Sequence, residues 1–134
     1  MDTTILVVDD SKMQLRLTEK ILTDIGYKNI VMATSVDDAK VILCKEKIDL
    51  ILSDWHMPNV SGLDFVKYVR STKEFEKIPF IMVTTEHEKS NIFEAAKAGI
   101  QNYVFKPVNK DTLKKKLYEL AKTYPAIAPP HEAL

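Results

Sequence analysis

The chain has 134 residues, of which 46% are hydrophobic, and its 19 basic residues balance its 19 acidic residues. This length fits one domain, and the even charge argues against a dedicated nucleic-acid binder. The single cysteine, Cys44, excludes an internal disulfide, and its apolar neighbours predict a small core residue. We see no signal segment and no apolar run of roughly 18 residues, so we expect a cytoplasmic protein without membrane insertion.

Five short apolar runs are predicted to be β-strands. They cover residues 5–8, 29–33, 48–53, 79–83 and 103–105. Most of their residues are apolar in succession instead of alternating with polar ones. Such continuous runs are typical of strands that are buried on both faces of a parallel sheet.

A stretch with helical periodicity follows each predicted strand. The predicted helices cover residues 12–25, 36–45, 62–71, 91–98 and 110–123. In the first of them, Leu17, Ile21, Leu22 and Ile25 recur at helical spacing and should face the core. Candidate N-caps are Ser35, Ser61, Ser90 or Asn91, and Asn109, and candidate C-terminal stops are Gly26 and Gly99.

The alternation of strands and helices predicts an α/β fold with a parallel sheet covered on both faces. The sequence gives no sign of a repeat or of a second domain, so residues 1–124 should form one domain. Residues 125–134 are rich in proline and lack a helical period, which predicts a flexible tail. We favour a natural chain end there over the start of a linker to a further domain.

Chemically useful side chains stand at the carboxyl ends of the predicted strands. They are Asp9 and Asp10 after the first strand, Asp54 after the third, Thr84 after the fourth and Lys106 after the fifth. Ligands of open parallel sheets bind at this edge. We therefore expect these five residues to converge although they are distant in the sequence.

The chemistry of this set indicates phosphoryl transfer to a carboxylate. Three carboxylates placed together repel one another, which raises the pKa of at least one of them or requires a cation. An all-oxygen site suits Mg²⁺ better than Zn²⁺. Lys106 adds a positive charge that can meet a phosphate, and Thr84 adds a hydroxyl donor. These groups would place and neutralise a phosphoryl group that is moving onto Asp54.

Each residue also has an ordinary structural interpretation. Asp54 could cap the following turn, and Asp9 or Asp10 could cap the first helix. Thr84 could be a strand-end residue without a partner, and Lys106 a solvated loop lysine. The combined pattern is more specific than any single member.

The motifs that carry these residues resemble the receiver domain of two-component response regulators. They are Val7–Asp10, Leu52–Pro58 with Gly62, Val83–Thr84 and Lys106–Pro107, and the resemblance spans about residues 4–123. Within the family the sequence is most similar to the stand-alone, CheY-like chemotaxis regulators. The resemblance implies a doubly wound, flavodoxin-like fold with strand order 2-1-3-4-5 and five helices.

The resemblance also implies roles for individual residues. Asp54 would accept the phosphoryl group from a histidine kinase, giving an aspartyl phosphate. Asp10, Asp54 and the main-chain carbonyl of His56 would hold Mg²⁺, and Asp9 would support it through water. Lys106 would pair with the phosphoryl group.

A second set of residues would turn phosphorylation into a signal. Thr84 would move toward the phosphoryl group, and Tyr103 would rotate inward as the space behind Thr84 empties. The resemblance implies a cis Lys106–Pro107 peptide bond. His56 and Glu86 would tune the lifetime of the phosphoryl group, and we favour an exposed His56 that contributes only its carbonyl.

The output would be a changed protein-binding face on the fourth helix, the fifth strand and the last helix. Candidate residues of this face are Ile92, Tyr103, Phe105 and Lys116. The implied partner is an effector protein such as a flagellar motor switch component. The run 114–116 of three lysines is more typical of a solvated helix face than of a partner site.

Three other functions compete with this one. The chain could be the receiver portion of a larger regulator with a separate output domain. A Mg²⁺-dependent phosphatase with an aspartyl-phosphate intermediate would need an acidic residue two places after Asp54, where His56 stands. A flavin-binding module would place its phosphate near Asp9 and Asp10, which would repel it. We therefore expect a switch that at most catalyses its own phosphorylation and dephosphorylation, and no enzyme acting on other substrates.

Overall fold

A computed structural model describes residues 2–85 and 89–130 of the chain. Its strands are β1 (Thr4–Val8), β2 (Asn29–Ala33), β3 (Leu50–Asp54), β4 (Phe80–Thr84) and β5 (Asn102–Phe105). Its helices are α1 (Lys12–Ile25), α2 (Val36–Lys45), α3 (Gly62–Ser71), α4 (Lys89–Ala98) and α5 (Lys110–Ala121), followed by the short 3₁₀ helix η1 (Pro125–Ile127). The predicted alternation of strands and helices is confirmed.

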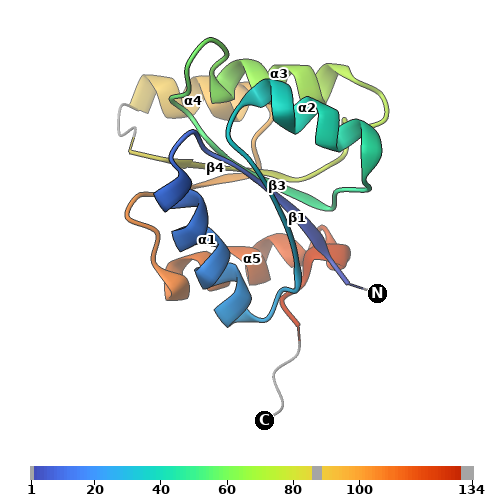
Figure 1. The fold of residues 1–134 in the computed structure, drawn as a ribbon, viewed down its shortest axis with the longest axis vertical. Coiled ribbons are helices and arrows are strands. Elements are labelled where there is room, and N and C mark those ends of the chain that lie inside the picture. Colours follow the sequence, from blue (N-terminus) through green and yellow to red (C-terminus); the bar gives the residue numbers. More distant parts are fainter. Residues whose placement is uncertain (1, 86–88, 131–134) are drawn as a thin grey trace.

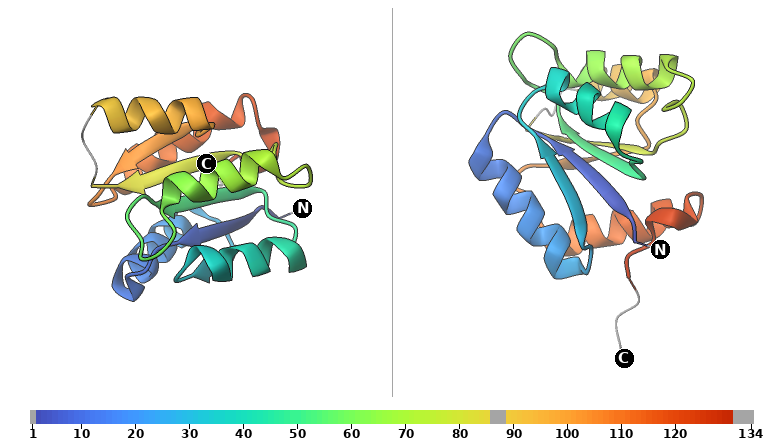
Figure 2. Two further views of the ribbon diagram at one scale, coloured as in Figure 1. Left: turned by 90° about the horizontal axis from the view of Figure 1, so that it is seen from above. Right: turned by 45° about the vertical axis from the view of Figure 1, so that its right-hand side comes forward.

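The five strands form one parallel sheet in the order β2-β1-β3-β4-β5. Helices α1 and α5 cover one face of this sheet, and α2, α3 and α4 cover the other (Figure 1). Figure 2 shows the same three layers from two further directions. The doubly wound, flavodoxin-like architecture predicted from the sequence is therefore confirmed.

The core consists of two apolar layers separated by the sheet. Ile5 and Val7 of β1 pack in the layer under α1 and α5, and Leu6 and Val8 pack in the layer under the other three helices. All four side chains are nearly inaccessible to solvent. Because successive side chains of a strand point to opposite faces, both layers need apolar residues, which explains the uninterrupted apolar runs.

Polar side chains fix the beginnings of four helices. The side chains of Ser11, Ser35, Ser61 and Asn109 each accept a hydrogen bond from the backbone N–H three residues further on. Three of these caps were predicted, and Ser11 takes the place that Asp9 or Asp10 could have held. Helix α4 begins at Lys89, so neither Ser90 nor Asn91 precedes it as a cap.

Two predictions about burial are wrong because the helices are turned slightly from the assumed orientation. Cys44 is exposed on α2, where its neighbour Leu43 is the residue that enters the core. On α1, Leu15 and Thr18 are buried while Leu17 is 41% exposed. In both helices some apolar residues lie on the buried face and others lie beside it, where they are exposed.

The segment after residue 124 packs against the domain as far as the structure describes it, in contrast to the predicted flexible tail. Ile127 is 1% exposed and belongs to the core layer under α1 and α5. Its carbonyl accepts a hydrogen bond of 2.6 Å from the Tyr27 hydroxyl, and the Ala126 carbonyl accepts one of 2.6 Å from Thr3 Oγ1. These contacts join the segment to the amino-terminal edge of the sheet.

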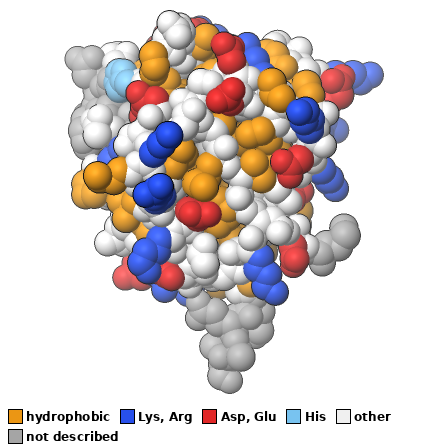
Figure 3. All heavy atoms as spheres, viewed as in Figure 1, with side chains coloured by type: hydrophobic (Ala, Val, Ile, Leu, Met, Phe, Trp, Pro, Cys, Tyr) orange, Lys and Arg blue, Asp and Glu red, His pale blue; other side chains and the backbone are white. Residues whose placement is uncertain are grey.

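The surface carries charges of both signs. In the face that Figure 3 shows, acidic and basic side chains are interspersed with apolar ones, and no broad basic field stands out. None of the helices in the described part of the chain combines the length and apolarity that crossing a bilayer requires.

Candidate functional site

The site is centred on Asp54, the last residue of β3. Strand β3 lies between β1 and β4, and Asp54 is paired in register with Val83 of β4. This central place leaves the Asp54 side chain only 10% exposed. A carboxylate is thus presented at the carboxyl edge of the sheet, at the end of a strand that has a neighbour on each side.

The loop after β1 brings two more carboxylates to the same point. Carboxylate oxygens of Asp9, Asp10 and Asp54 all lie within 4.8 Å of one another. Asp9 is buried and Asp10 is exposed. Asp9 Oδ1 accepts a hydrogen bond of 2.9 Å from the Ser11 backbone N–H, which fixes its side chain beside the start of α1.

Lys106 supplies the positive charge of the site from the end of β5. Its Nζ lies 2.8 Å from Asp9 Oδ2 and 3.1 Å from Asp54 Oδ2, and its side chain is 15% exposed. Its peptide bond to Pro107 is cis, as the resemblance implied. One ammonium therefore bridges two carboxylates that come from different strands.

The two charges change each other's protonation. Burial raises the pKa of the Asp54 carboxyl, while the hydrogen bond and charge of Lys106 lower it in part, and the charge of Asp9 raises it again. Burial alone would lower the pKa of Lys106, but its hydrogen bonds to Asp9 and Asp54 outweigh this and raise it. The raised pKa of Lys106 favours its charged form, whereas the raised pKa of Asp54 disfavours its charged form.

Backbone contacts fix the orientation of Asp54. The Trp55 N–H donates a hydrogen bond of 2.7 Å to Asp54 Oδ1, and the buried Ser53 hydroxyl donates one of 3.0 Å to the Asp54 carbonyl. Asp54 Oδ1 is thus held by the backbone, while Oδ2 faces Lys106. A bound group can therefore approach a carboxylate that is already oriented.

Gly62, at the start of α3, allows the loop after Asp54 to close. Its N–H donates a hydrogen bond of 2.8 Å to the Trp55 carbonyl. A Cβ atom at this position would overlap the Asp54 carbonyl oxygen and come within 2.9 Å of Trp55 Cα. The residue pattern showed Gly62 only as part of the family motif, because nothing in its local sequence indicates the close approach.

The other predicted site residues take different positions. Thr84 is 1% exposed at the end of β4, and its carbonyl accepts a hydrogen bond of 2.9 Å from the Lys106 N–H. The His56 side chain is exposed, with its ring centroid 6.4 Å from that of Trp55. Glu86 lies outside the described residues.

The residues expected at the output face lie on α4, β5 and α5. Tyr103 is half-buried, and its ring meets the Phe105 ring edge-on at 5.2 Å. Lys116 Nζ lies 4.9 Å from the centre of the Tyr103 ring. Ile92 is half-buried on α4. The fold therefore places the Lys116 ammonium against β5.

The donor set at the carboxyl edge fits a hard divalent cation. Its ligand atoms are carboxylate oxygens of three residues that lie close enough to share one ion, and one of them reaches the solvent. Neither a histidine ring nor a thiol is part of this acidic group. The chemistry of the donors is that of a Mg²⁺ site and differs from that of a Zn²⁺ site.

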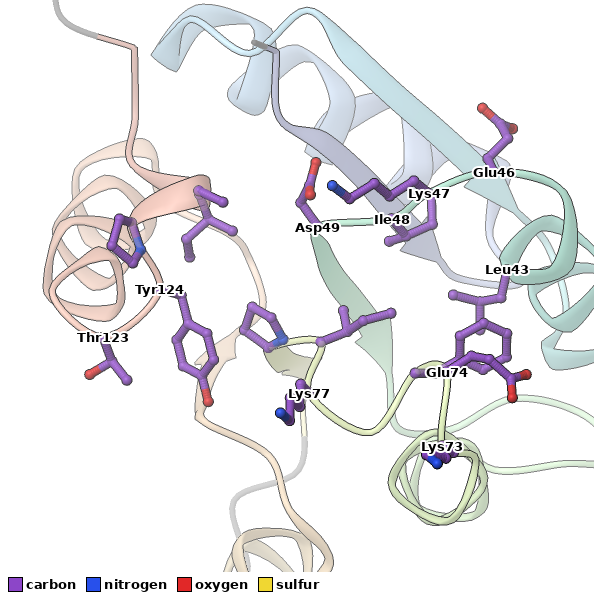
Figure 4. A pocket seen from close by; sticks show the side chains of 16 residues that line it. Leu43, Glu46, Lys47, Ile48, Asp49, Lys73, Glu74, Lys77, Thr123 and Tyr124 are labelled. Atoms are coloured by element: carbon purple, nitrogen blue, oxygen red, sulfur yellow. The ribbon is translucent and has the colours of Figure 1, made fainter.

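A hollow among the described residues lies elsewhere. It has a volume of about 530 Å³ and opens between the loops before β3 and β4 and the end of α5. Figure 4 shows Lys47, Lys77 and Tyr124 around it, together with several apolar side chains. It is at the amino-terminal edge of the sheet, and Asp54 is not among its lining residues.

Comparison with known proteins agrees with this geometry. The sequence model of the response regulator receiver domain matches residues 5–118, and the chain belongs to this family. It is 40% identical over 120 residues to a chemotaxis protein CheY homolog of Campylobacter jejuni, covering 89% of this chain and 92% of that protein. It is also 40% identical over 114 residues to the chemotaxis protein CheY1 of Helicobacter pylori, covering 84% and 92% of the two chains.

A solved structure shows the same fold. The chemotaxis response regulator CheY4 of Vibrio cholerae superimposes with a TM-score of 0.82 at 32% sequence identity, covering 90% of this chain and 99% of that one. The expected membership in the CheY-like receiver domains is confirmed by both comparisons. The class of protein is a signalling domain of two-component systems.

Proposed function

We propose that this protein is a phosphorylation-activated switch in which Asp54 accepts a phosphoryl group from a histidine kinase. The observation that carries the proposal is the pairing of the buried Asp54 carboxylate with Lys106 Nζ at 3.1 Å, beside two further carboxylates. A nucleophilic oxygen, an ammonium and a hard-cation site at one point are what phosphoryl transfer to a carboxylate requires.

The proposed metal is Mg²⁺, held by Asp10, Asp54 and the main-chain carbonyl of His56, with Asp9 acting through water. The support is the set of three carboxylates whose oxygens lie within 4.8 Å of one another. When bound, Mg²⁺ would neutralise negative charge on the phosphoryl oxygens.

In the proposed transfer an Asp54 carboxylate oxygen attacks the phosphorus atom of the donor. An O–P bond forms, and the bond between phosphorus and the donor histidine nitrogen breaks, leaving its electron pair on that nitrogen. Lys106 Nζ, which already lies between Asp9 and Asp54, donates a hydrogen bond to a phosphoryl oxygen. The Thr84 hydroxyl donates to another, and no side chain of this protein has to act as general acid or base.

The proposed signal is a shift of a two-state equilibrium. Thr84 moves toward the phosphoryl group, and Tyr103 then turns toward the space behind it. The face formed by Ile92, Tyr103, Phe105 and Lys116 changes and is recognised by an effector. The similarity to chemotaxis proteins favours a component of the flagellar motor switch as that effector and a cytoplasmic location.

Two residues next to the site would set how long the phosphoryl group persists. His56 is exposed on the loop after Asp54, and an imidazole there is proposed to affect the approach of water. Glu86 is proposed for the same role on the loop after β4. Both proposals concern the rate of dephosphorylation and leave the identity of the acceptor unchanged.

The fluorescence of Trp55 tests the metal and phosphoryl steps. Trp55 is 8% exposed, and its backbone N–H donates a hydrogen bond to the Asp54 carboxylate. We expect Mg²⁺, and then acetyl phosphate as a small phosphodonor, to change its fluorescence. Mass spectrometry should show one added phosphoryl group that is absent from Asp54→Asn. Folded wild-type protein that responds to neither reagent would contradict the proposal.

A second experiment addresses the partner. Protein treated with Mg²⁺ and beryllofluoride, which mimics the phosphoryl group, is used as bait beside Asp54→Ala treated in the same way. An effector should be retained by the first bait and lost from the second. Equal retention by both would argue against a phosphorylation-dependent face.

A further inference from the structure

The half-buried Lys116 points its ammonium at β5. Its Nζ donates hydrogen bonds of 2.6 Å to the Tyr103 carbonyl and 3.2 Å to Asn102 Oδ1. The same nitrogen lies 4.9 Å from the centre of the Tyr103 ring. An ammonium has three N–H donors, and two of them are used on the strand.

The Tyr103 ring is thereby held between two groups. Lys116 provides a cation for its π system, and Phe105 meets it edge-on, with 60° between the ring planes. Both contacts are of kinds that stabilise one ring orientation over others. Burial lowers the pKa of Lys116, and Glu119 partly opposes this, which agrees with an ammonium drawn toward the protein.

The contacts of Lys116 differ in whether they depend on the orientation of the Tyr103 ring. The bonds to Asn102 Oδ1 and to the Tyr103 carbonyl belong to side-chain and backbone groups that need not move with the ring. The cation–π contact, in contrast, depends on the orientation of the ring. Turning the ring inward therefore costs the cation–π contact and leaves the rest of the Lys116 interactions in place.

We propose that Lys116 stabilises the resting orientation of the Tyr103 ring and so sets how readily phosphorylation at Asp54 activates the protein. This inference rests on the proposed function, in which Tyr103 turns inward on activation. It assigns Lys116 a regulatory role inside the unbound protein, separate from any contact with an effector. A cation–π contact at a partly exposed site shifts a two-state equilibrium by roughly two- to five-fold.

The test follows the Tyr103 ring in the full chain without any partner. Fluorotyrosine is incorporated, and its ¹⁹F signal is assigned with Tyr103→Phe. In Lys116→Met, which removes the charge and keeps an unbranched side chain, the inward population should rise by roughly two- to five-fold before activation. The beryllofluoride concentration that gives half-maximal response in the presence of Mg²⁺ should fall by a similar factor. Lys115→Met, at an exposed position one residue earlier on the same helix, should behave like the wild type.

A double-variant comparison separates the ring from the backbone contacts. The effect of Lys116→Met on half-maximal beryllofluoride concentration, read by Trp55 fluorescence, should disappear when Tyr103 is replaced by leucine. Persistence of the effect there would overturn the assignment to the ring. If Lys116→Met does not fold, Lys116→Gln takes its place, because glutamine can still donate a hydrogen bond to the Tyr103 carbonyl. We expect the same changes in the Tyr103 signal and in the half-maximal beryllofluoride concentration.

The results distinguish this inference from the proposed function. If beryllofluoride leaves both Tyr103 and Trp55 of the wild type unchanged, the phosphorylation switch itself is wrong. If the inward population before activation and the half-maximal beryllofluoride concentration are the same in wild type and in Lys116→Met, the switch stands and the role of Lys116 is wrong. A role of Lys116 in effector contact alone would give that second result.

Discussion

Gly62 lies so close to Asp54 that a methyl group at position 62 would overlap the Asp54 carbonyl oxygen. The helix that follows the site therefore begins in direct contact with the backbone of its central residue. We expect Gly62→Ala to lower the free energy of unfolding by about 1–3 kcal/mol, because the backbone has to shift to admit the methyl group. Urea denaturation measures this, with Lys67→Ala at an exposed position of the same helix as the control.

The same variant should weaken binding of Mg²⁺ as read by Trp55 fluorescence, since the displaced loop carries the proposed carbonyl ligand of His56. Unchanged stability and unchanged Mg²⁺ affinity together would show that the loop tolerates the methyl group without moving.

Asp54→Asn should stabilise the protein without metal at neutral pH by about 1 kcal/mol, the size of a typical single-site effect. Burial raises the pKa of Asp54, so its ionised form is disfavoured in the folded state. A carboxyl with a raised pKa contributes stability below its unfolded pKa and loses it as the pH rises through the folded pKa. The difference in the free energy of unfolding between wild type and Asp54→Asn should therefore be present at pH 7 and vanish near pH 4.

Urea denaturation at both pH values, in the presence of a chelator, checks this. Destabilisation by Asp54→Asn at pH 7 would mean that the ion pair with Lys106 outweighs the cost of burying the charge. Asp38→Asn, at an exposed position on α2, serves as the control.

Lys106→Gln removes the cation that lies between Asp9 and Asp54. We expect the variant to lose about 2 kcal/mol of stability at neutral pH, because two buried carboxyl side chains lose their cationic partner. Added Mg²⁺ should raise its thermal midpoint by more than that of the wild type, since the ion replaces the missing charge. Thermal unfolding with and without Mg²⁺ measures both effects, and Lys110→Gln at an exposed position should show neither. An equal response to Mg²⁺ in variant and wild type would place the ion away from these carboxylates.

Ile127→Ala should lower the free energy of unfolding by about 2–4 kcal/mol, because the side chain is 1% exposed and its loss leaves a cavity in the core. The exposed Val41→Ala on α2 should change stability by less than about 0.5 kcal/mol. Denaturant titration compares the two. Near-equal values would show that the segment after residue 124 adds little to the domain in solution.

Much of the fold follows from the sequence because local and tertiary signals agree. The apolar runs of β1 and β3 require burial on both faces, and the caps Ser35, Ser61 and Asn109 satisfy backbone donors that any helix start leaves open. The approximate bounds of the elements need no knowledge of their neighbours. What the sequence misplaces is the exact rotation of a helix, as Cys44 shows.

The packing of the final segment could not be predicted in the same way. Residues 125–130 have no periodic pattern, and Ile127 is buried in the core layer under α1 and α5. Its carbonyl is bonded to the Tyr27 hydroxyl, which is about a hundred residues distant in the chain. The local pattern of a proline-rich stretch therefore predicts a flexible tail even where contacts with distant residues hold the stretch in place.

The candidate site shows the same division. The convergence of Asp9, Asp54 and Lys106 follows from the rule that parallel strands share a carboxyl edge. The close approach of Gly62 and the inward orientation of Lys116 depend on loop geometry and side-chain conformation. Neither has a signature in the residues themselves.

The contact of Ala126 with Thr3 has a practical consequence for handling the protein. It sets the last described turn of the chain at the amino-terminal edge of the sheet, while Asp54 stands at the carboxyl edge. A purification tag or fluorescent reporter fused behind residue 130 would therefore start from the pole opposite the acceptor. Attached there, it would leave the approach of a kinase open, whereas a label on the loop after β3 would stand in its path.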